Sequence, residues 1–418
     1  MTTVFLVWAV VTLLLTLNAL RPLPVTWLSV LTFFTGWIAS ELAPFHLVIH
    51  LLVTAAFVSA GAVEGTAGAV ALGTAAVTAI GLIVLIRQAH RVGDVVEAAL
   101  REGLGDDYAD HISPEFLDRH DPRVPLRALA LPFRWRHKDV RRIRNVSYGP
   151  YGHRNKLDVY QPREEGSGRP VLFQIHGGGW VVGDKREQGI PLMLHMAARG
   201  WVCVATNYRL SPRATFPDHL VDLKKSLAWV REHIAEYGGD PEFVVVTGGS
   251  AGGHLTALVG LTQNDPDFQP GFEDVDTSVA AAVPYYGVYD FINDFGIKAN
   301  EQRARFFLER VVMKCRRDEN PDLWRKASPQ ALVTPDDPPF FVIHGHHDTL
   351  VPVQEARQFV AKLRSTCRGP IVYAELPGAQ HAFDMFPSLR TGHVVRAVER
   401  FLDYVYSGHL SAKVEVES

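Results

Sequence analysis

Apolar and polar positions divide the chain into two unlike parts. Residues 1–20, 23–40, 42–63 and 65–86 are four stretches without a charged side chain. A helix needs about 20 such residues to cross the hydrocarbon layer of a bilayer. Helices of soluble proteins carry a polar stripe, which these stretches lack. The pattern therefore predicts an all-helical transmembrane region of about four helices over residues 1–87.

From about residue 140 the pattern changes to short β-branched runs that alternate with helical ones. The runs are KLDVY, VLFQI, WVCVATNY, FVVVTGG, VAAAVPYYG, FFVIHG and IVYAEL. This alternation predicts an α/β domain, a mostly parallel sheet with helices on both faces. We expect that domain over residues 140–407, after a connector or cap over residues 88–139 and before a C-terminal tail over residues 408–418.

Charge follows the same division. Of the 42 basic and 45 acidic side chains, only Arg21, Glu41 and Glu64 lie in the first 86 residues, and the formal net charge is -3. Such a balance provides no large positive field, so we expect no nucleic-acid partner. The 3 cysteines are odd in number and far apart, which predicts neither a disulfide framework nor a zinc site.

Basic residues near the apolar stretches predict an orientation. Arg87, Arg91 and Arg101 follow the last stretch, whereas Arg21 lies alone between the first two. If all four stretches span, the positive-inside rule predicts an integral, multi-pass membrane protein with its large domain in the cytoplasm. Two prolines, Pro22 and Pro24, leave open a re-entrant hairpin in place of the first pair of spans.

The strongest local signal for chemistry is Gly248-Gly249-Ser250-Ala251-Gly252, which follows FVVVT and precedes HLTALVGL. A strand that turns sharply into a helix forces the residue between them into strained backbone geometry, and flanking glycines remove side chains that would collide there. We expect Ser250 to project from the top of the sheet. The alternative is a Gly-rich turn that cradles a phosphate.

A second glycine cluster, His176-Gly177-Gly178-Gly179-Trp180, follows the run VLFQI. Acyl transfer develops negative charge on a carbonyl oxygen, which preorganised backbone N–H groups stabilise. Consecutive glycines let the backbone approach a substrate closely. A flexible turn is the alternative interpretation.

A nucleophilic serine needs a base to take its proton and a carboxylate to orient that base. Asp348 follows FFVIHG, and His381 follows IVYAEL. Both lie after predicted strands, at the edge where open α/β sheets build their sites. Asp384 is a rival carboxylate, but it lies only three residues after His381.

One histidine-rich stretch suggests a metal site, namely His344, His346, His347 and Asp348. Neighbouring residues on a strand point to opposite faces, however, and no distant Cys or Asp cluster completes a ligand set. We expect no metal and no other cofactor.

These motifs together resemble the α/β-hydrolase fold, specifically the hormone-sensitive-lipase branch of serine esterases and lipases. The resemblance covers residues 140–405 and depends on LDVYQP, HGGGWVVGDK, NYRLSP, FPDHLVDLKKSLAWV, GGDPEFVVVTGGSAGG, HGHHDTLVP and PGAQHAFD, in that order. The chain departs from the branch at Gly249, where an acidic residue is common, and in its membrane region, which most members lack.

The resemblance implies roles for individual residues. Ser250 would be the nucleophile, His381 the general base and acid, and Asp348 its orienting partner. The oxyanion hole would be formed by the amides of Gly178, Gly179 and Ala251. Supporting positions would be His176, Gly177, Gly248 and Gly252.

We therefore expect a membrane-anchored serine esterase or lipase whose substrate is a lipid-like or soluble ester. Within the same chemistry, the alternatives are an amide or formamide hydrolase and a sugar acetyl-ester hydrolase. From another class, the alternative is a non-catalytic hydrolase-like binding module, although the intact Ser, Asp and His set argues against it.

Residues 298–327 interrupt the alternation of strands and helices. Leu308, Val311, Val312 and Cys315 recur there at helical spacing among basic residues, which predicts an amphipathic cover helix. Such a helix would be a substrate lid, a packed surface helix or a membrane-surface helix.

Overall fold

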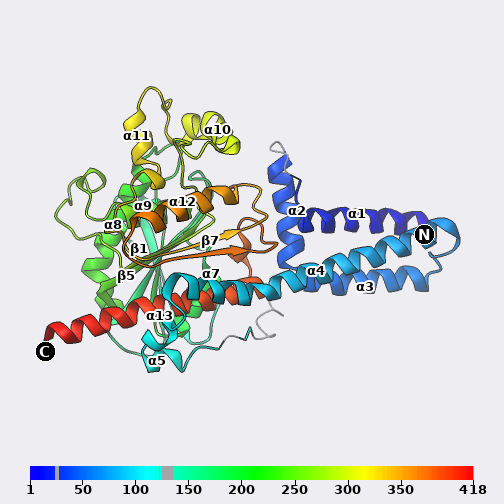
Figure 1. Ribbon diagram of the computed structural model, residues 1–418, viewed down its shortest axis with the longest axis horizontal. Coiled ribbons are helices and arrows are strands. Elements are labelled where there is room, and N and C mark those ends of the chain that lie inside the picture. Colours follow the sequence, from blue (N-terminus) through cyan, green and yellow to red (C-terminus); the bar gives the residue numbers. More distant parts are fainter. Residues whose placement is uncertain (24–27, 122, 125–134, 418) are drawn as a thin grey trace.

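The computed structural model describes residues 1–23, 28–121, 123–124 and 135–417. It has two parts, an α/β domain and a bundle of apolar helices that projects from one side of it (Figure 1).

Within the described residues, eight strands form one sheet in the order β1-β2-β4-β3-β5-β6-β7-β8. β2 pairs antiparallel with β1 and with β4, and every other neighbouring pair is parallel. The predicted mostly parallel sheet is thus confirmed. The strands are β1 Val140–Ser147, β2 Lys156–Pro162, β3 Arg169–Ile175, β4 Val202–Thr206, β5 Gly239–Gly249, β6 Ala281–Tyr285, β7 Phe340–Gly345 and β8 Ile371–Leu376.

Helices cover both faces of the sheet because strand side chains alternate between two cores. On β5, Val244 and Val246 belong to one core, whereas Phe243 and Val245 belong to the other. The first core is shared with α8 Asp218–His233, α9 Ala251–Leu261 and α12 Val353–Thr366. The second is shared with α7 Ile190–Ala198 and α13 Leu389–Glu417. Helix α13 thus continues through the segment that we expected to be a tail.

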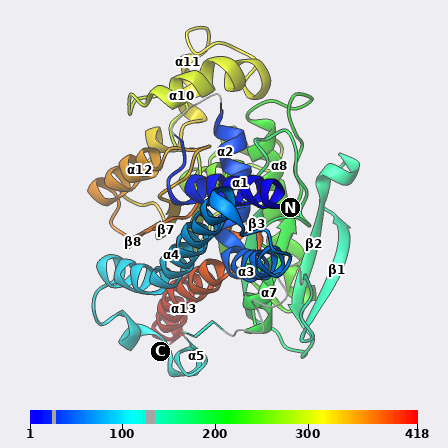
Figure 2. The same cartoon turned by 90° about the vertical axis from the view of Figure 1, so that its right-hand side faces the viewer.

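The apolar quarter forms four helices, as expected, but they do not all run the same way. Helices α1 Thr2–Leu20, α3 Ala43–Ser59 and the first part of α4 Gly65–Leu104 lie side by side, while α2 Ser29–Glu41 lies across their end, next to the α/β domain (Figures 1 and 2). Helices α2 and α3 meet at an angle of 83°.

Not all four of these helices are long and apolar enough to cross a membrane. Two helices, α1 and α4, are long and apolar enough to cross a membrane, or three if the bent α2–α3 pair counts as one span. Helix α2 has 13 residues and is about 20 Å long, which is short of the hydrocarbon thickness of about 30 Å. Pro44 lies in the first turn of α3, and a proline there cannot continue a preceding helix.

The predicted connector begins inside a helix. Helix α4 continues without a break for 40 residues, so the expected boundary at residue 87 falls within it. Its last turns bury Val92, Val96 and Leu100 in the second core, with α13 and the sheet. Helix α4 is thereby part of both the bundle and the α/β domain. Residue 122 and residues 125–134 of the connector lie outside the described residues.

The predicted cover helix is present as shorter pieces. It consists of α10 Lys298–Arg303, a π-helical stretch Ala304–Val312 and α11 Pro321–Lys326. Leu308 and Val312 are buried, and Val311 and Cys315 pack half-buried against the same core. The other short helices in the described residues are α5 Pro114–Leu117 and the single turns Tyr108–His111, Gly152–Asn155, Ile234–Tyr237, Pro266–Phe268, Pro329–Ala331 and Phe383–Met385.

Candidate active site

Ser250 stands at the turn between β5 and α9. Its backbone has φ 60° and ψ −122°, a strained conformation for a residue other than glycine. The turn is tight because β3 lies directly against it. A Cβ on Gly248 would lie 2.5 Å from the carbonyl oxygen of Ile175, and one on Gly252 would lie 2.4 Å from it. Only glycine fits at these two positions, so the strand can turn into the helix at Ser250.

The glycine loop that follows β3 lies beside Ser250. A Cβ on Gly177 would lie 3.1 Å from the Cβ of Ser250. Gly178 and Gly179 have φ values of +109° and +59°, which favour glycine. Ala251 is the first residue of α9, where backbone N–H groups have no partner within the helix. The loop and this helix end therefore border the same space.

His176 holds the glycine loop through hydrogen bonding and ring stacking. It is buried, and its Nδ1 donates to the carbonyl oxygen of Gly177 at 2.8 Å. Its ring stacks on Tyr208, whose hydroxyl donates to the carbonyl oxygen of His176 at 2.9 Å. Burial lowers the pKa of His176 to about 4, so the ring is neutral at pH 7. Gln188, which the sequence did not single out, accepts from the amide of Gly177 at 2.6 Å.

Asp348 and His381 meet at the ends of β7 and β8. His381 Nδ1 lies 2.6 Å from Asp348 Oδ2, and both side chains are almost fully buried. The other oxygen of Asp348 accepts from the amides of Leu350 and Val351 at 2.9 and 2.8 Å. Burial pushes the pKa of Asp348 upward, but the charge of His381 and hydrogen bonds from His344 and His381 outweigh it and hold the pKa well below its usual range.

Gln380 ties the two loops together. Its side-chain oxygen accepts from the amide of Thr349 at 2.8 Å and from the amide of His381 at 2.9 Å. Thr349 directly follows Asp348, and His381 is itself the other member of the pair. A polar residue directly before the histidine was the sole sequence signal for this role.

The rival carboxylate, Asp384, has a different partner. It accepts a hydrogen bond from the hydroxyl of Tyr286, and burial raises its pKa. The Tyr286 ring lies 4.6 Å from the His381 ring. A Cβ on Gly249 would lie 2.5 Å from the Tyr286 hydroxyl. Tyr286 thus fills the space that a side chain at position 249 would need.

The histidines near Asp348 do not converge on a common point. His344 Nε2 bonds the carbonyl oxygen of Val351 at 3.0 Å and also lies 3.4 Å from Asp348 Oδ2, whereas His346 Nδ1 bonds Glu375 at 2.6 Å. In the part of the chain that the structure describes, the residues that come close enough to share a metal ion are His120, Glu399 and Asp403. None of them was predicted as a site residue.

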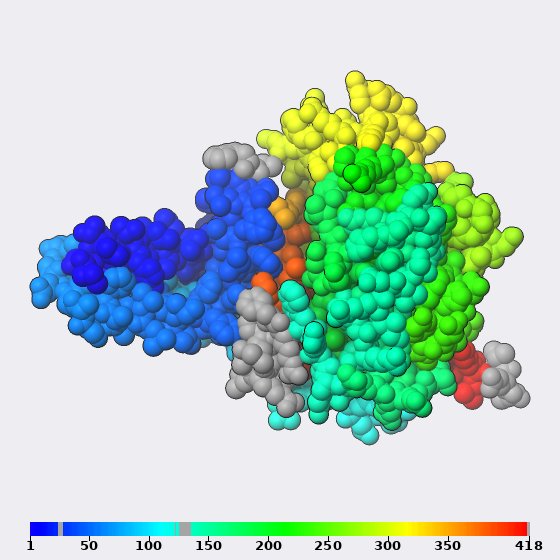
Figure 3. Space-filling view, turned by 180° about the vertical axis from the view of Figure 1, so that it is seen from behind, coloured from blue at the N-terminus to red at the C-terminus, as the bar shows by residue number. Residues whose placement is uncertain are grey.

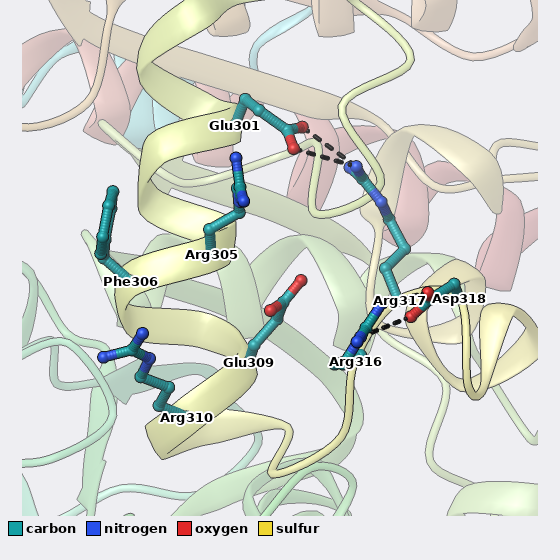
Figure 4. Close-up of a pocket in the computed structure, with 8 residues that line it drawn as sticks. All are labelled: Glu301, Arg305, Phe306, Glu309, Arg310, Arg316, Arg317 and Asp318. Carbon is teal, nitrogen blue, oxygen red and sulfur yellow. Dashed lines mark hydrogen bonds and ion pairs between the residues drawn. The ribbon is translucent and has the colours of Figure 1, made fainter.

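Phe307 of the cover segment lies against the glycine loop. A Cβ on Gly179 would lie 3.6 Å from the ring of Phe307. A separate pocket of about 520 Å³ lies on the outside of this segment and is lined mainly by charged side chains (Figure 4), namely Glu301, Arg305, Phe306, Glu309, Arg310, Arg316, Arg317 and Asp318. No predicted site residue lines that pocket.

The chain is similar in sequence to several known proteins. The family described as BD-FAE matches residues 157–363. The probable carboxylic ester hydrolase LipM of Mycobacterium tuberculosis is 45% identical over 412 residues, which cover 96% of this chain and 93% of LipM. Esterase LipQ of the same organism is 43% identical, covering 78% of this chain and 77% of LipQ.

The chain belongs to this family of carboxylic ester hydrolases. Because the match to LipM covers 96% of this chain, it includes most of the apolar N-terminal region of this chain as well as its α/β domain. Among solved structures, an esterase B from Lactobacillus rhamnosis has a TM-score of 0.56 at 19% identity, covering 77% of this chain and 99% of that protein. This likeness supports the α/β-hydrolase fold alone.

Proposed function

We propose that this protein is a membrane-anchored hydrolase that cleaves carboxylic esters through an acyl-enzyme on Ser250. One observation carries the proposal. The Ser250 turn, the glycine loop and the Asp348–His381 pair all lie where parallel strands end, and Ser250 borders the loop while His381 is bonded to Asp348 at 2.6 Å. Such a set of nucleophile, amides, base and carboxylate is what acyl transfer requires.

In the first half of the reaction, Ser250 Oγ forms a bond to the ester carbonyl carbon while its proton passes to His381 Nε2. The carbonyl electrons move onto oxygen, then return as the bond to the alcohol oxygen breaks. The alcohol leaves with the proton from His381. In the second half, water gives a proton to His381 and attacks the acyl carbon. His381 then returns that proton to Ser250 Oγ as the bond between Oγ and the acyl carbon breaks and the acid leaves.

The surroundings of each group suit these steps. Asp348 stays ionised because its pKa lies well below the usual range, so it can stabilise the protonated ring of His381. The amides of Gly178, Gly179 and Ala251 would hold the oxyanion, and loss of one such donor lowers kcat by about 10²–10³-fold in other enzymes.

The exposed surface of the bundle supports the membrane anchoring. Exposed side chains on α1 are large and apolar, including Val4 at 59%, Val7 at 58% and Leu14 at 60% exposure. Burying that surface in hydrocarbon satisfies it without a protein partner. If α1, α3 and α4 cross, Arg21 and Arg87 lie on the side of the α/β domain and Glu64 lies on the other. This arrangement favours a cytoplasmic α/β domain under the positive-inside rule.

Purified full-length protein in proteoliposomes provides the test. Hydrolysis of p-nitrophenyl butyrate should be lost in Ser250→Ala, by about 10⁴-fold or more. Gly73→Ala, at an open position on α4 with nothing within 4 Å, should retain the wild-type rate. Equal hydrolysis by wild type and Ser250→Ala would overturn the proposal.

A further inference from the structure

Helix α2 of the apolar region is bonded to both catalytic loops. The indole Nε1 of Trp37 donates to the carbonyl oxygen of Ala382 at 2.9 Å. The hydroxyl of Thr349 donates to the carbonyl oxygen of Ser29 at 3.1 Å. Ala382 follows His381 directly, and Thr349 follows Asp348. One face of a 13-residue helix therefore contacts the residue next to each member of the pair.

The same face contacts His381 itself. The rings of Phe33 and His381 lie 5.9 Å apart at 80°, an edge-to-face arrangement that aromatic rings prefer. Phe33 is only 8% exposed. One turn further along α2, Trp37 stacks on Phe386 with ring centroids 4.9 Å apart. The orientation of the His381 ring is thus limited on one side by α2.

The outer face of α2 is apolar and exposed. Its residues are Val30 at 58%, Leu31 at 61%, Phe34 at 51% and Ile38 at 41% exposure. No charged residue occurs between Leu28 and Ser40. Helix α2 packs against α1 at the end of the bundle (Figures 1 and 3), and α1 also exposes large apolar side chains.

The orientation of the bundle indicates that lipid covers this apolar face of α2. If α1 and α4 cross a bilayer, α2, at 83° to α3, lies near the plane of its surface. A helix that lies in this plane with one apolar face is buried about 5–10 Å into the boundary between headgroups and acyl chains.

We propose that α2 is an interfacial helix that positions His381 from the bilayer surface, with its inner face fixing the His381 loop and its outer face resting on lipid. This inference depends on the membrane anchoring in the proposed function. It makes Trp37 and Phe33 positioning residues and places the catalytic histidine about one helix diameter from the bilayer, roughly 10 Å. Esters whose acyl or alcohol part stays in the membrane are then the substrates that fit best.

The positioning role is tested with Trp37→Phe, which removes the donor to Ala382 and keeps a ring on Phe386. We expect kcat for p-nitrophenyl acetate, per active site titrated with a fluorophosphonate, to fall about tenfold with little change in KM, because a small displacement of a catalytic group slows chemistry more than binding. Phe33→Leu should act in the same direction. Trp8→Phe is the matched control, since Trp8 stacks on His50 within the bundle and should leave kcat unchanged.

A purely structural role for Trp37 would reduce the number of titratable sites and leave kcat per site unchanged. That result in both variants would overturn the positioning claim. Hydrolysis that still depends on Ser250 would show that the proposed function stands even though this inference fails.

The bilayer contact is tested by fluorescence quenching in vesicles of phosphatidylcholine and phosphatidylglycerol. A fluorophore on Phe34→Cys should be quenched by lipids with a spin label near the headgroup, and one on Ile80→Cys by lipids labelled deeper in the chain. A fluorophore on Val414→Cys, near the far end of α13, should be unaffected. Cys315 and Cys367 are replaced by Ser for this work, while Cys203 is fully buried.

Two quenching results would contradict the inference. Quenching at Ile80 without quenching at Phe34 would mean that the bundle enters the bilayer and α2 does not touch it. Absence of quenching at both positions would instead reject the membrane anchoring on which the inference depends.

Discussion

Glu41 of α2 and Arg390 of α13 form an ion pair in which both side chains are fully buried. Ser388 also donates to Glu41, at 2.7 Å. The pair joins the apolar region to the α/β domain a few residues after His381. A buried charge is stable only when it is paired and hydrogen-bonded, so this contact fixes where α2 docks.

Removal of that pair should destabilise the protein. Glu41→Gln leaves the Arg390 charge buried without a counter-ion, and such changes cost about 3–5 kcal/mol. The measurement is thermal unfolding of the detergent-solubilised protein. Glu64→Gln, at an exposed position in the turn between α3 and α4, should change the midpoint little. Equal midpoints for the two variants would show that the pair does not hold the two parts together.

Replacement of the two candidate carboxylates, Asp348 and Asp384, should lower kcat to very different extents. Asp348→Asn removes the charge that orients His381 and should lower kcat by about 10³–10⁴-fold. Asp384→Asn keeps a hydrogen-bond acceptor for Tyr286 and should lower kcat by less than about tenfold. Steady-state kinetics on p-nitrophenyl butyrate decide between them, and a larger loss in Asp384→Asn would reverse the assignment.

Gly249 should not tolerate a side chain. A Cβ there would lie 2.5 Å from the Tyr286 hydroxyl, and Tyr286 packs on His381. Gly249→Ala should therefore lose about 1–3 kcal/mol of stability through overpacking, together with most of its activity. If Gly249→Ala has the unfolding midpoint and the hydrolysis rate of the wild type, Tyr286 does not lie in close contact with the turn.

Buried histidines should make the fold sensitive to acid. Burial lowers the pKa of His176 and of His219 to about 4 and that of His254 to about 3, whereas in the unfolded chain a histidine titrates near about 6.5. Protonation then favours the unfolded state, so the stability is fully present above about pH 6.5 and is lost as the pH falls towards about 4.

His219 provides the test because it lies outside the proposed catalytic set. Unfolding midpoints from pH 8 to pH 5 should fall below pH 6.5 in the wild type, and His219→Gln should make that decline shallower by up to about 1.4 kcal/mol per pH unit. A decline of unchanged slope in the variant would show that His219 does not contribute.

Local sequence motifs indicated many residues of the candidate site. Gly178 and Gly179 have positive φ values, a local requirement that consecutive glycines signal in the sequence. Gly248 and Gly252 are required by the close carbonyl oxygen of Ile175, and the sequence indicated them through the motif around Ser250. Gln380 and Tyr286 were missed because their roles arise from contacts between loops that are far apart in the chain. Tyr286 also leaves no room for a side chain at Gly249, a contact that the sequence does not indicate.

The apolar region shows where pattern reasoning fails. Residues 23–40 have the composition of a span, and composition does not reveal that the helix begins only at Ser29 and ends at Glu41. Helix α2 is held across the bundle by Trp37, Glu41 and their partners in the α/β domain. Such contacts over more than 300 positions of sequence leave no local periodicity to detect.

The most direct test of the central claim is to identify the residue that a fluorophosphonate modifies in the full-length protein. Peptide mass spectrometry should find the phosphonyl adduct on Ser250, with modification and ester hydrolysis lost in parallel as the reagent is titrated. An adduct at another residue, or full inhibition without modification of Ser250, would contradict an acyl-enzyme on this serine.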